Sequence, residues 1–189
     1  MVGLVALLNL GYFGAEFAVA LAIGSVSLFA DSVDFLEDTS VNLLILIALG
    51  WSLKAKARVG MGLAALLLVP ALATLWALWS KFQLPAPPAP LPLTVTGLGA
   101  LLVNFICATL LMRFRHHSGS LMRAAFLSAR NDVLANIAII IAGGLTALTH
   151  AAWPDMVVGA GIMVINADAA REVWQAARSE HREATAPHA

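Results

Sequence analysis

Six long apolar segments constrain this chain of 189 residues more than any other feature. A helix needs about 20 mostly apolar residues to cross the hydrocarbon core of a bilayer, which is roughly 30 Å thick. The segments that meet this requirement are Val2–Ile23, Ser27–Trp51, Val59–Ser80, Leu93–Met112, Met122–Thr149 and Ala152–Ala170. Only 12% of the residues are charged, against about 25% in a soluble domain. We therefore predict an all-α, polytopic membrane protein with six transmembrane helices.

The placement of lysine and arginine predicts the orientation of these helices. Nine of the 11 basic residues lie on one side: Lys54, Lys56, Arg58, Arg113, Arg115, Arg123, Arg171, Arg178 and Arg182. Lys81 lies on the other side, and Arg130 falls inside the fifth span. Because basic loops stay in the cytoplasm, both termini are expected there. This predicts a six-helix transmembrane domain over residues 1–176 and a short polar cytoplasmic tail over residues 177–189.

Two connecting segments also have a recognisable character. The segment Lys81–Pro92 contains five prolines and is expected to be extended rather than helical. The segment Arg113–Arg123 is basic and is expected to be a cytoplasmic loop. The net charge of the whole chain is zero, so nothing indicates binding to nucleic acid.

Acidic residues inside the predicted spans are the most informative feature for function. They are Glu16, Asp31, Asp34, Glu37, Asp38 and Asp132, six of the 11 acids in the chain. Each charged side chain at the bilayer centre costs about 2.5–3.5 kcal/mol on insertion scales. Such residues usually face a cavity and carry a function, so we expect a functional site within the membrane.

Helical spacing brings several of these acids to one level. At 100° per residue, Asp34, Asp38 and Asn42 share one stripe of the second span. The fifth span repeats this spacing with Ser128, Asp132 and Asn136. Asp38 and Asp132 both fall about 15 Å from the end at which their helix enters the membrane. The pattern predicts that two helices supply oxygen ligands near the midplane. The alternative is a set of protonated acids that hydrogen-bond between helices.

The stretch from Gly24 to Asp38 resembles the second-span signature of the cation diffusion facilitator family, which are six-span exporters of divalent metals. Asn9 and Glu16 in the first span also resemble family positions, as does Trp153-Pro154-Asp155 before the sixth span. The resemblance implies a divalent metal efflux transporter in a bacterial inner membrane. It implies metal ligation by Asp34, Asp38 and Asp132, and exchange of the metal for protons.

Ser128 departs from the family pattern, because it stands where members usually carry His or Asp. Ser128 and Asn131 are therefore only weak candidate ligands. Loss of the imidazole removes a typical zinc ligand, and an oxygen-only set favours harder ions such as Mn²⁺, Fe²⁺ or Mg²⁺. The transported ion is expected to belong to the Zn²⁺, Mn²⁺, Fe²⁺, Co²⁺ or Cd²⁺ class, with no separate cofactor.

The C-terminal part of the chain bears on assembly. Fewer than 20 residues follow Arg171, where family members usually add a cytoplasmic domain that dimerises. We therefore expect a homodimer that forms through the transmembrane helices within the lipid bilayer.

Two other functions remain open from the sequence. One is a degenerate membrane protein that binds metal without transporting it, which Ser128 and Arg130 favour. The other is a Mg²⁺-dependent enzyme that resembles intramembrane prenyltransferases, although 189 residues are too few for their larger number of spans. We expect Arg130 to have a structural role, either pairing with Glu37 or reaching the inner interface. For Asp31 we expect a capping, gating or proton-path role rather than direct ligation. For Glu16, a proton relay and a buried hydrogen bond both stay open.

Overall fold

The computed structural model describes residues 2–47, 72–112 and 120–183, with the side chains of some helical residues in the last range excepted. All regular secondary structure in these ranges is helical. The helices are α1 (Val2–Ile23), α2 (Val26–Ile47), a helix over residues 72–83, α4 (Pro90–Met112), α5 (Ser120–Thr149) and α6 (Trp153–Glu183).

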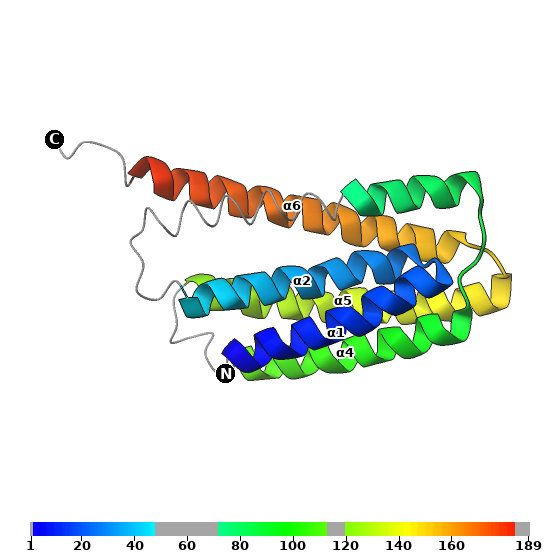
Figure 1. The fold of residues 1–189 in the computed structure, drawn as a ribbon, viewed down its shortest axis with the longest axis horizontal. Coiled ribbons are helices and arrows are strands. Elements are labelled where there is room, and N and C mark those ends of the chain that lie inside the picture. Colours follow the sequence, from blue (N-terminus) through cyan, green and yellow to red (C-terminus); the bar gives the residue numbers. More distant parts are fainter. Residues whose placement is uncertain (1, 48–71, 113–119, 184–189) are drawn as a thin grey trace.

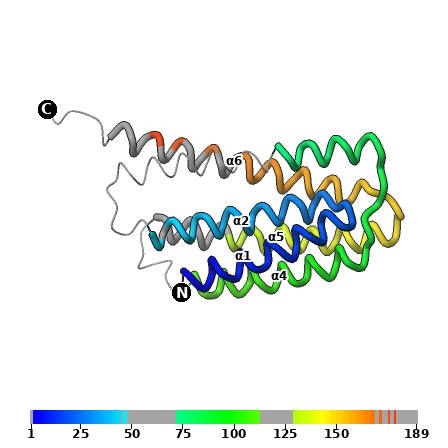
Figure 2. The backbone as a smooth tube through the Cα atoms, in the orientation of Figure 1, coloured from blue at the N-terminus to red at the C-terminus, as the bar shows by residue number. Residues whose placement is uncertain are grey.

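Helices α1, α2, α4 and α5 form the central bundle (Figure 1). The most extensive contacts join α4 to α5 and α1 to α2, and α2 also contacts α5 and α6. The helix over residues 72–83 lies beside the first half of α6, on the α2 side of the bundle (Figure 1 and Figure 2). Helix α2 therefore lies between α6 and the other helices of the central bundle. This position places its acidic residues inside the molecule.

A two-residue connection joins α1 to α2. Gly24 ends α1 in the left-handed conformation, with φ of 63°, and the amide of Ser25 donates to the carbonyl of Ala20 at 3.0 Å. This is the Schellman ending that favours glycine, because glycine has no Cβ to clash at positive φ. The hydroxyl of Ser25 then accepts from the amide of Leu28 at 3.1 Å and so caps the start of α2.

The bundle has a polar interior and an apolar exterior. Asn9, Asn42, Asn104 and Asn136 are buried together with most of the acids, whereas large apolar side chains on α1, α4 and α5 are exposed. Three helices of the described chain are long and apolar enough to cross a membrane, namely Val2–Ile23, Pro90–Met112 and Ala129–Thr149. Helix α2 has 22 residues and carries four acids. A polar interior inside an apolar surface is the arrangement expected when lipid is the solvent.

The helix limits agree in part with the predicted spans. Helix α1 has the predicted limits, and α2 begins one residue before the predicted start. Residues 48–71 lie outside the described ranges, and with them most of the predicted third span. Helix α6 continues to Glu183, across the boundary predicted between domain and tail at residue 176.

The predicted extended loop from Lys81 to Pro92 is wrong at both ends. The helix over residues 72–83 includes Lys81, and α4 begins at Pro90. Pro90 and Pro92 are tolerated in the first turn of α4, where the missing amide would have no helical partner. The loop predicted over Arg113–Arg123 is likewise too long, because α5 begins at Ser120.

Candidate metal site

Helices α2 and α5 bring the three predicted metal-binding aspartates into one buried region. Asp34, Asp38 and Asp132 are at most 9% exposed. Asp132 on α5 lies within electrostatic range of both Asp34 and Asp38 on α2. The carboxyl groups of the two helices therefore face the same interior.

Asp38 is also connected to α1 and α4 through hydrogen bonds. The side-chain amide of Asn9 donates to Asp38 Oδ2 at 3.4 Å. Asn9 Oδ1 accepts from the thiol of Cys107 at 3.4 Å, which joins α4 to the same network. The side chain of Asn42 donates to the backbone carbonyl of Asp38 at 2.7 Å and leaves its own Oδ1 without a donor. These contacts orient Asp38 and leave oxygen atoms around it available to a cation.

The two weaker candidate ligands differ from the aspartates. Asn131 is exposed, and its Oδ1 accepts from Arg130 Nη2 at 3.4 Å, so it is not grouped with the buried acids. The side chain of Ser128 lies outside the part of the chain whose side chains are described.

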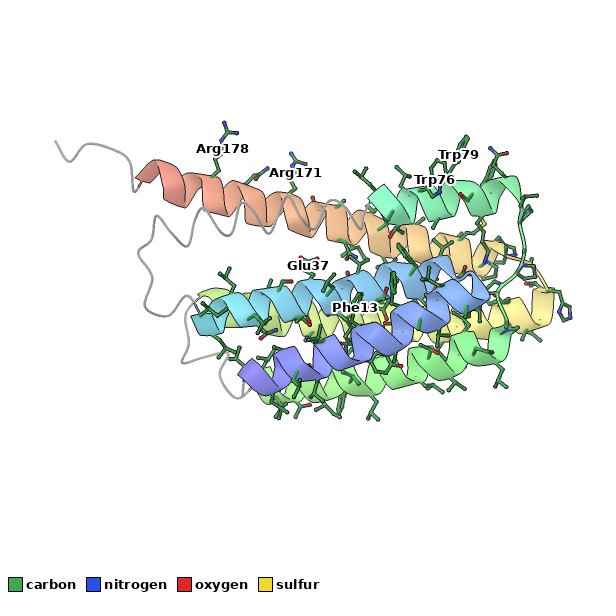
Figure 3. The ribbon with its side chains drawn as sticks, viewed as in Figure 1. Phe13, Glu37, Trp76, Trp79, Arg171 and Arg178 are labelled. Carbon is green, nitrogen blue, oxygen red and sulfur yellow. The ribbon has the colours of Figure 1, made fainter. Side chains whose placement is uncertain are left out.

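Among the described residues no ion pair within 4 Å joins Arg130 to Glu37. Figure 3 shows Glu37 on the side of α2 that faces away from α1 and α4.

A second acidic group lies closer to the end of the bundle where α1 meets α2. Glu16 of α1 and Asp31 of α2 are both fully buried. Asn136 donates its side-chain amide to Asp31 Oδ2 at 2.6 Å, and Asn104 donates to Asn136 Oδ1 at 3.1 Å. Asn136 was predicted to share a stripe with Asp132, and the hydrogen bond of its side-chain amide goes to Asp31 of α2. The asparagines thus supply donors to Asp31 and supply none to Glu16.

This interior favours a positively charged occupant. No lysine or arginine in the described ranges forms an ion pair with Asp34 or Asp132. Neighbouring carboxylates in a buried site repel each other unless a cation or protons neutralise them. In the described part of the chain, no group of three His, Cys, Asp or Glu residues is arranged to hold a metal ion as it stands.

Asp155, in the first turn of α6, has a structural role that spacing alone did not indicate. Its Oδ1 accepts from the hydroxyls of Ser25 and Ser27 at 2.6 and 2.7 Å and from the amide of Ser27 at 3.1 Å. Its Oδ2 accepts from the amide of Val26 at 2.9 Å. Asp155 thus satisfies free amides at the start of α2 from another helix, where the helix dipole also favours a negative charge.

Lys81 completes this cluster at the end of the bundle. Its ammonium group lies 3.7 Å from Asp155 Oδ2 and donates to the carbonyl of Gly24. Burial lowers the pKa of Lys81 from 10.5, and the attraction of Asp155 only partly offsets this effect. Gly159 allows the same close packing, because a Cβ at this position would lie 2.8 Å from the backbone carbon of Val26. Lys81, Asp155 and Gly159 therefore join α1, α2, α6 and the helix over residues 72–83.

The comparison with protein families agrees with this arrangement. No curated protein matches the chain. The family model described as the cation efflux transmembrane domain matches residues 2–179, which is nearly the whole sequence. The chain, with its buried acids inside an apolar helical bundle, therefore belongs to the cation efflux family of membrane transporters.

Proposed function

We propose that this cation efflux protein exports a divalent metal ion in exchange for protons. The observation that carries the proposal is the convergence of buried carboxyl groups from α2 and α5, namely Asp34, Asp38 and Asp132. Two helices that each contribute acids to one interior can change the size of that interior when they move. The site can then hold a metal ion in one arrangement and protons in another.

The donor atoms at this site determine which ions it accepts. Carboxylate and amide oxygens are the ligands of harder divalent cations, and a site without imidazole binds zinc less selectively. We infer a preference for Mn²⁺ or Fe²⁺ within the wider class of Zn²⁺, Mn²⁺, Fe²⁺, Co²⁺ and Cd²⁺. Mg²⁺ belongs in the same test because its ligands are also oxygen atoms.

Proton exchange follows from the chemistry of the same side chains. A carboxyl group binds metal in its ionised form, so metal binding releases any proton that it carries. On the cytoplasmic side, metal loads onto ionised Asp34, Asp38 and Asp132. On the outer side, where the proton concentration is higher, protons return to these carboxyl groups and displace the metal. The proton gradient thereby drives export.

The proposed transporter has six transmembrane helices with both termini in the cytoplasm. The exposed leucines on α1 and α4, together with Phe105 on α4, support contact with lipid. Arg171 and Arg178 on the second half of α6 point away from the other helices, which supports a cytoplasmic location for this end (Figure 3). We further propose a homodimer that forms through transmembrane helices in a bacterial inner membrane, with residues 1–176 as the membrane domain and 177–189 as a cytoplasmic tail.

Flux measurements in proteoliposomes test this function. The purified protein is reconstituted with a pH dye and a metal-sensitive dye, and Mn²⁺, Fe²⁺, Zn²⁺, Co²⁺, Cd²⁺ and Mg²⁺ are added in turn. We expect uptake of one of these metals with proton movement in the opposite direction. Asp38→Asn and Asp132→Asn are each expected to lower the flux by about 100-fold or more, because a metal-ligating carboxylate is lost.

Asp168→Asn is the matched control, because Asp168 is an exposed acid on α6, outside the buried group. It should transport at the wild-type rate. Wild-type flux in Asp38→Asn and Asp132→Asn would contradict the site assignment. Metal binding by the wild type without flux would instead support the alternative, a degenerate member that binds metal and does not transport it.

A further inference from the structure

We infer that Glu16 and Asp31 share one proton between their carboxyl groups, forming a proton site that is separate from the metal site and lies on its outer side. Its part in transport rests on the proposed function, whereas the shared proton itself does not. The pair joins α1 to α2 and lies outside the Asp34, Asp38 and Asp132 group.

The hydrogen-bond pattern of the pair carries this inference. Both residues are 0% exposed. The two carboxyl groups lie within hydrogen-bonding reach of each other. Both oxygens of Glu16 and Oδ1 of Asp31 have no hydrogen-bond donor among the described residues. Two carboxyl groups form a hydrogen bond only when one of them carries a proton, because an ionised carboxylate has no donor.

The neighbouring groups cannot supply the missing donor. On α1, the hydroxyl of Tyr12 donates to the carbonyl of Thr96 at 2.6 Å. On α5, Asn136 already donates to Asp31 Oδ2. On α4, Asn104 donates to Asn136 and leaves its own Oδ1 unpartnered. Two other acids lie within electrostatic range of the pair. Asp34 of α2 interacts with Glu16, and Asp132 of α5 interacts with Asp31.

A proton fits this site better than a metal ion does. The pair offers two carboxyl groups, and no group of three His, Cys, Asp or Glu residues in the described ranges is arranged to hold a metal. A shared proton needs only one oxygen from each of the two carboxyl groups. It also removes one negative charge from a fully buried pair, which otherwise carries a large desolvation cost.

The depth of the pair suggests how it serves transport. Glu16 lies seven residues before the end of α1 at Ile23, and Asp31 lies five residues after the start of α2 at Val26. Both are therefore about 10 Å or less from the end of the bundle where α1 meets α2. Asp38 lies seven residues further along α2, about 10 Å deeper. With both termini in the cytoplasm, a proton from outside reaches Glu16 and Asp31 before it reaches Asp38.

Infrared absorption spectroscopy of the full-length protein in lipid nanodiscs, with each variant compared with the wild type, tests the shared proton directly. A protonated carboxyl group absorbs apart from an ionised one, and spectra are recorded without metal and with Mn²⁺. We expect Glu16→Gln to remove a protonated carboxyl band that is present in the wild type under both conditions. Asp31→Asn should shift the frequency of that band, because the proton on Glu16 loses its carboxylate acceptor. If either variant leaves the band unchanged in position and area, the shared proton is excluded.

Glu37→Gln is the matched control for this measurement. It removes an acid of the same type from α2, at a half-buried position outside the pair, and should leave the band intact. Loss of the same band in Glu37→Gln would assign the proton to Glu37 and overturn the inference. Each substitution exchanges a carboxyl group for an amide of nearly equal size, which keeps the packing unchanged.

Transport in proteoliposomes tests the role of the pair. We expect Glu16→Gln to bind metal as the wild type does, since Asp34, Asp38 and Asp132 are intact. A given change in outside pH should alter the metal flux of this variant less than that of the wild type, by about threefold or more, because one proton-binding group is lost. An unchanged response would overturn the role of the pair in proton entry. If the wild-type protein moves no metal, the proposed function is contradicted instead. The infrared result would still show whether Glu16 and Asp31 share a proton.

Discussion

Two buried acidic regions of this molecule are built in opposite ways. At the junction of α1, α2 and α6, Asp155 accepts four hydrogen bonds from hydroxyls and amides and lies beside Lys81. In the middle of the bundle, Asp34 and Asp132 face other acids. Burial of a carboxylate is costly in both places. Where the chain supplies donors the acid stabilises the fold, and where it supplies further acids the repulsion between them has to be relieved by protons or by a cation.

Asp155→Ala tests the first half of this comparison and should have the largest effect. It leaves two hydroxyls and two amides at the start of α2 without their acceptor and removes the partner of Lys81. We expect a loss of stability of about 3 kcal/mol or more. Thermal unfolding of the purified protein in detergent measures this as a lower melting temperature. Asp155→Asn retains one acceptor oxygen and should lose less. Equal melting of Asp155→Ala and the wild type would show that α2 does not depend on this cap.

Asp34→Asn tests the second half and should act in the opposite direction. The neutral amide removes a charge that faces Asp132, Asp31 and Glu37. Without metal, we expect the variant to be as stable as the wild type or more stable, by on the order of 1 kcal/mol. Melting in detergent containing a chelator measures the difference. A clear loss of stability would place Asp34 with Asp155 among the structural acids.

Lys81→Met should have the smallest effect of the three. The substitution keeps most of the apolar side chain and removes the charge beside Asp155 and the hydrogen bond to Gly24. We expect a change of about 1 kcal/mol or less at neutral pH. Because the pKa of Lys81 is lowered in the folded protein, the unfolded chain binds more protons in the range below 10.5. The stability of the wild type should therefore rise relative to Lys81→Met as the pH approaches 10.5, which melting curves at several pH values can measure.

Hydropathy and helical periodicity were sufficient to predict much of this molecule. The limits of α1 agree with the prediction, because a predominantly apolar run is followed by Gly24. The grouping of Asp34 with Asp38 follows from four-residue spacing on a single helix. The start of α4 could not be predicted in this way, because Pro90 suits an extended loop and a first helical turn equally well.

The weaker ligand assignments show the limit of periodicity within the site. Asn131 is adjacent to Asp132 in the sequence, but it is exposed and bonded to Arg130. Asn136 shares a helical face with Asp132, but its amide donates to Asp31 of α2. Spacing tells which residues share a face of a helix. It does not tell which residue of the neighbouring helix each one meets, because that depends on how the two helices pack.

The sequence by itself determined that this chain forms apolar helices of membrane-spanning length that carry acids within them, because both properties depend on residues close together in the chain. Only the tertiary structure decided which buried acids accept hydrogen bonds from other helices and which lie among further acids. Asp155 acquires its donors from residues 128–130 positions earlier in the chain, and Glu16 meets Asp31 across two helices. The character of a buried carboxyl group depends on whether its neighbours in space can donate a hydrogen bond, and those neighbours come from other helices.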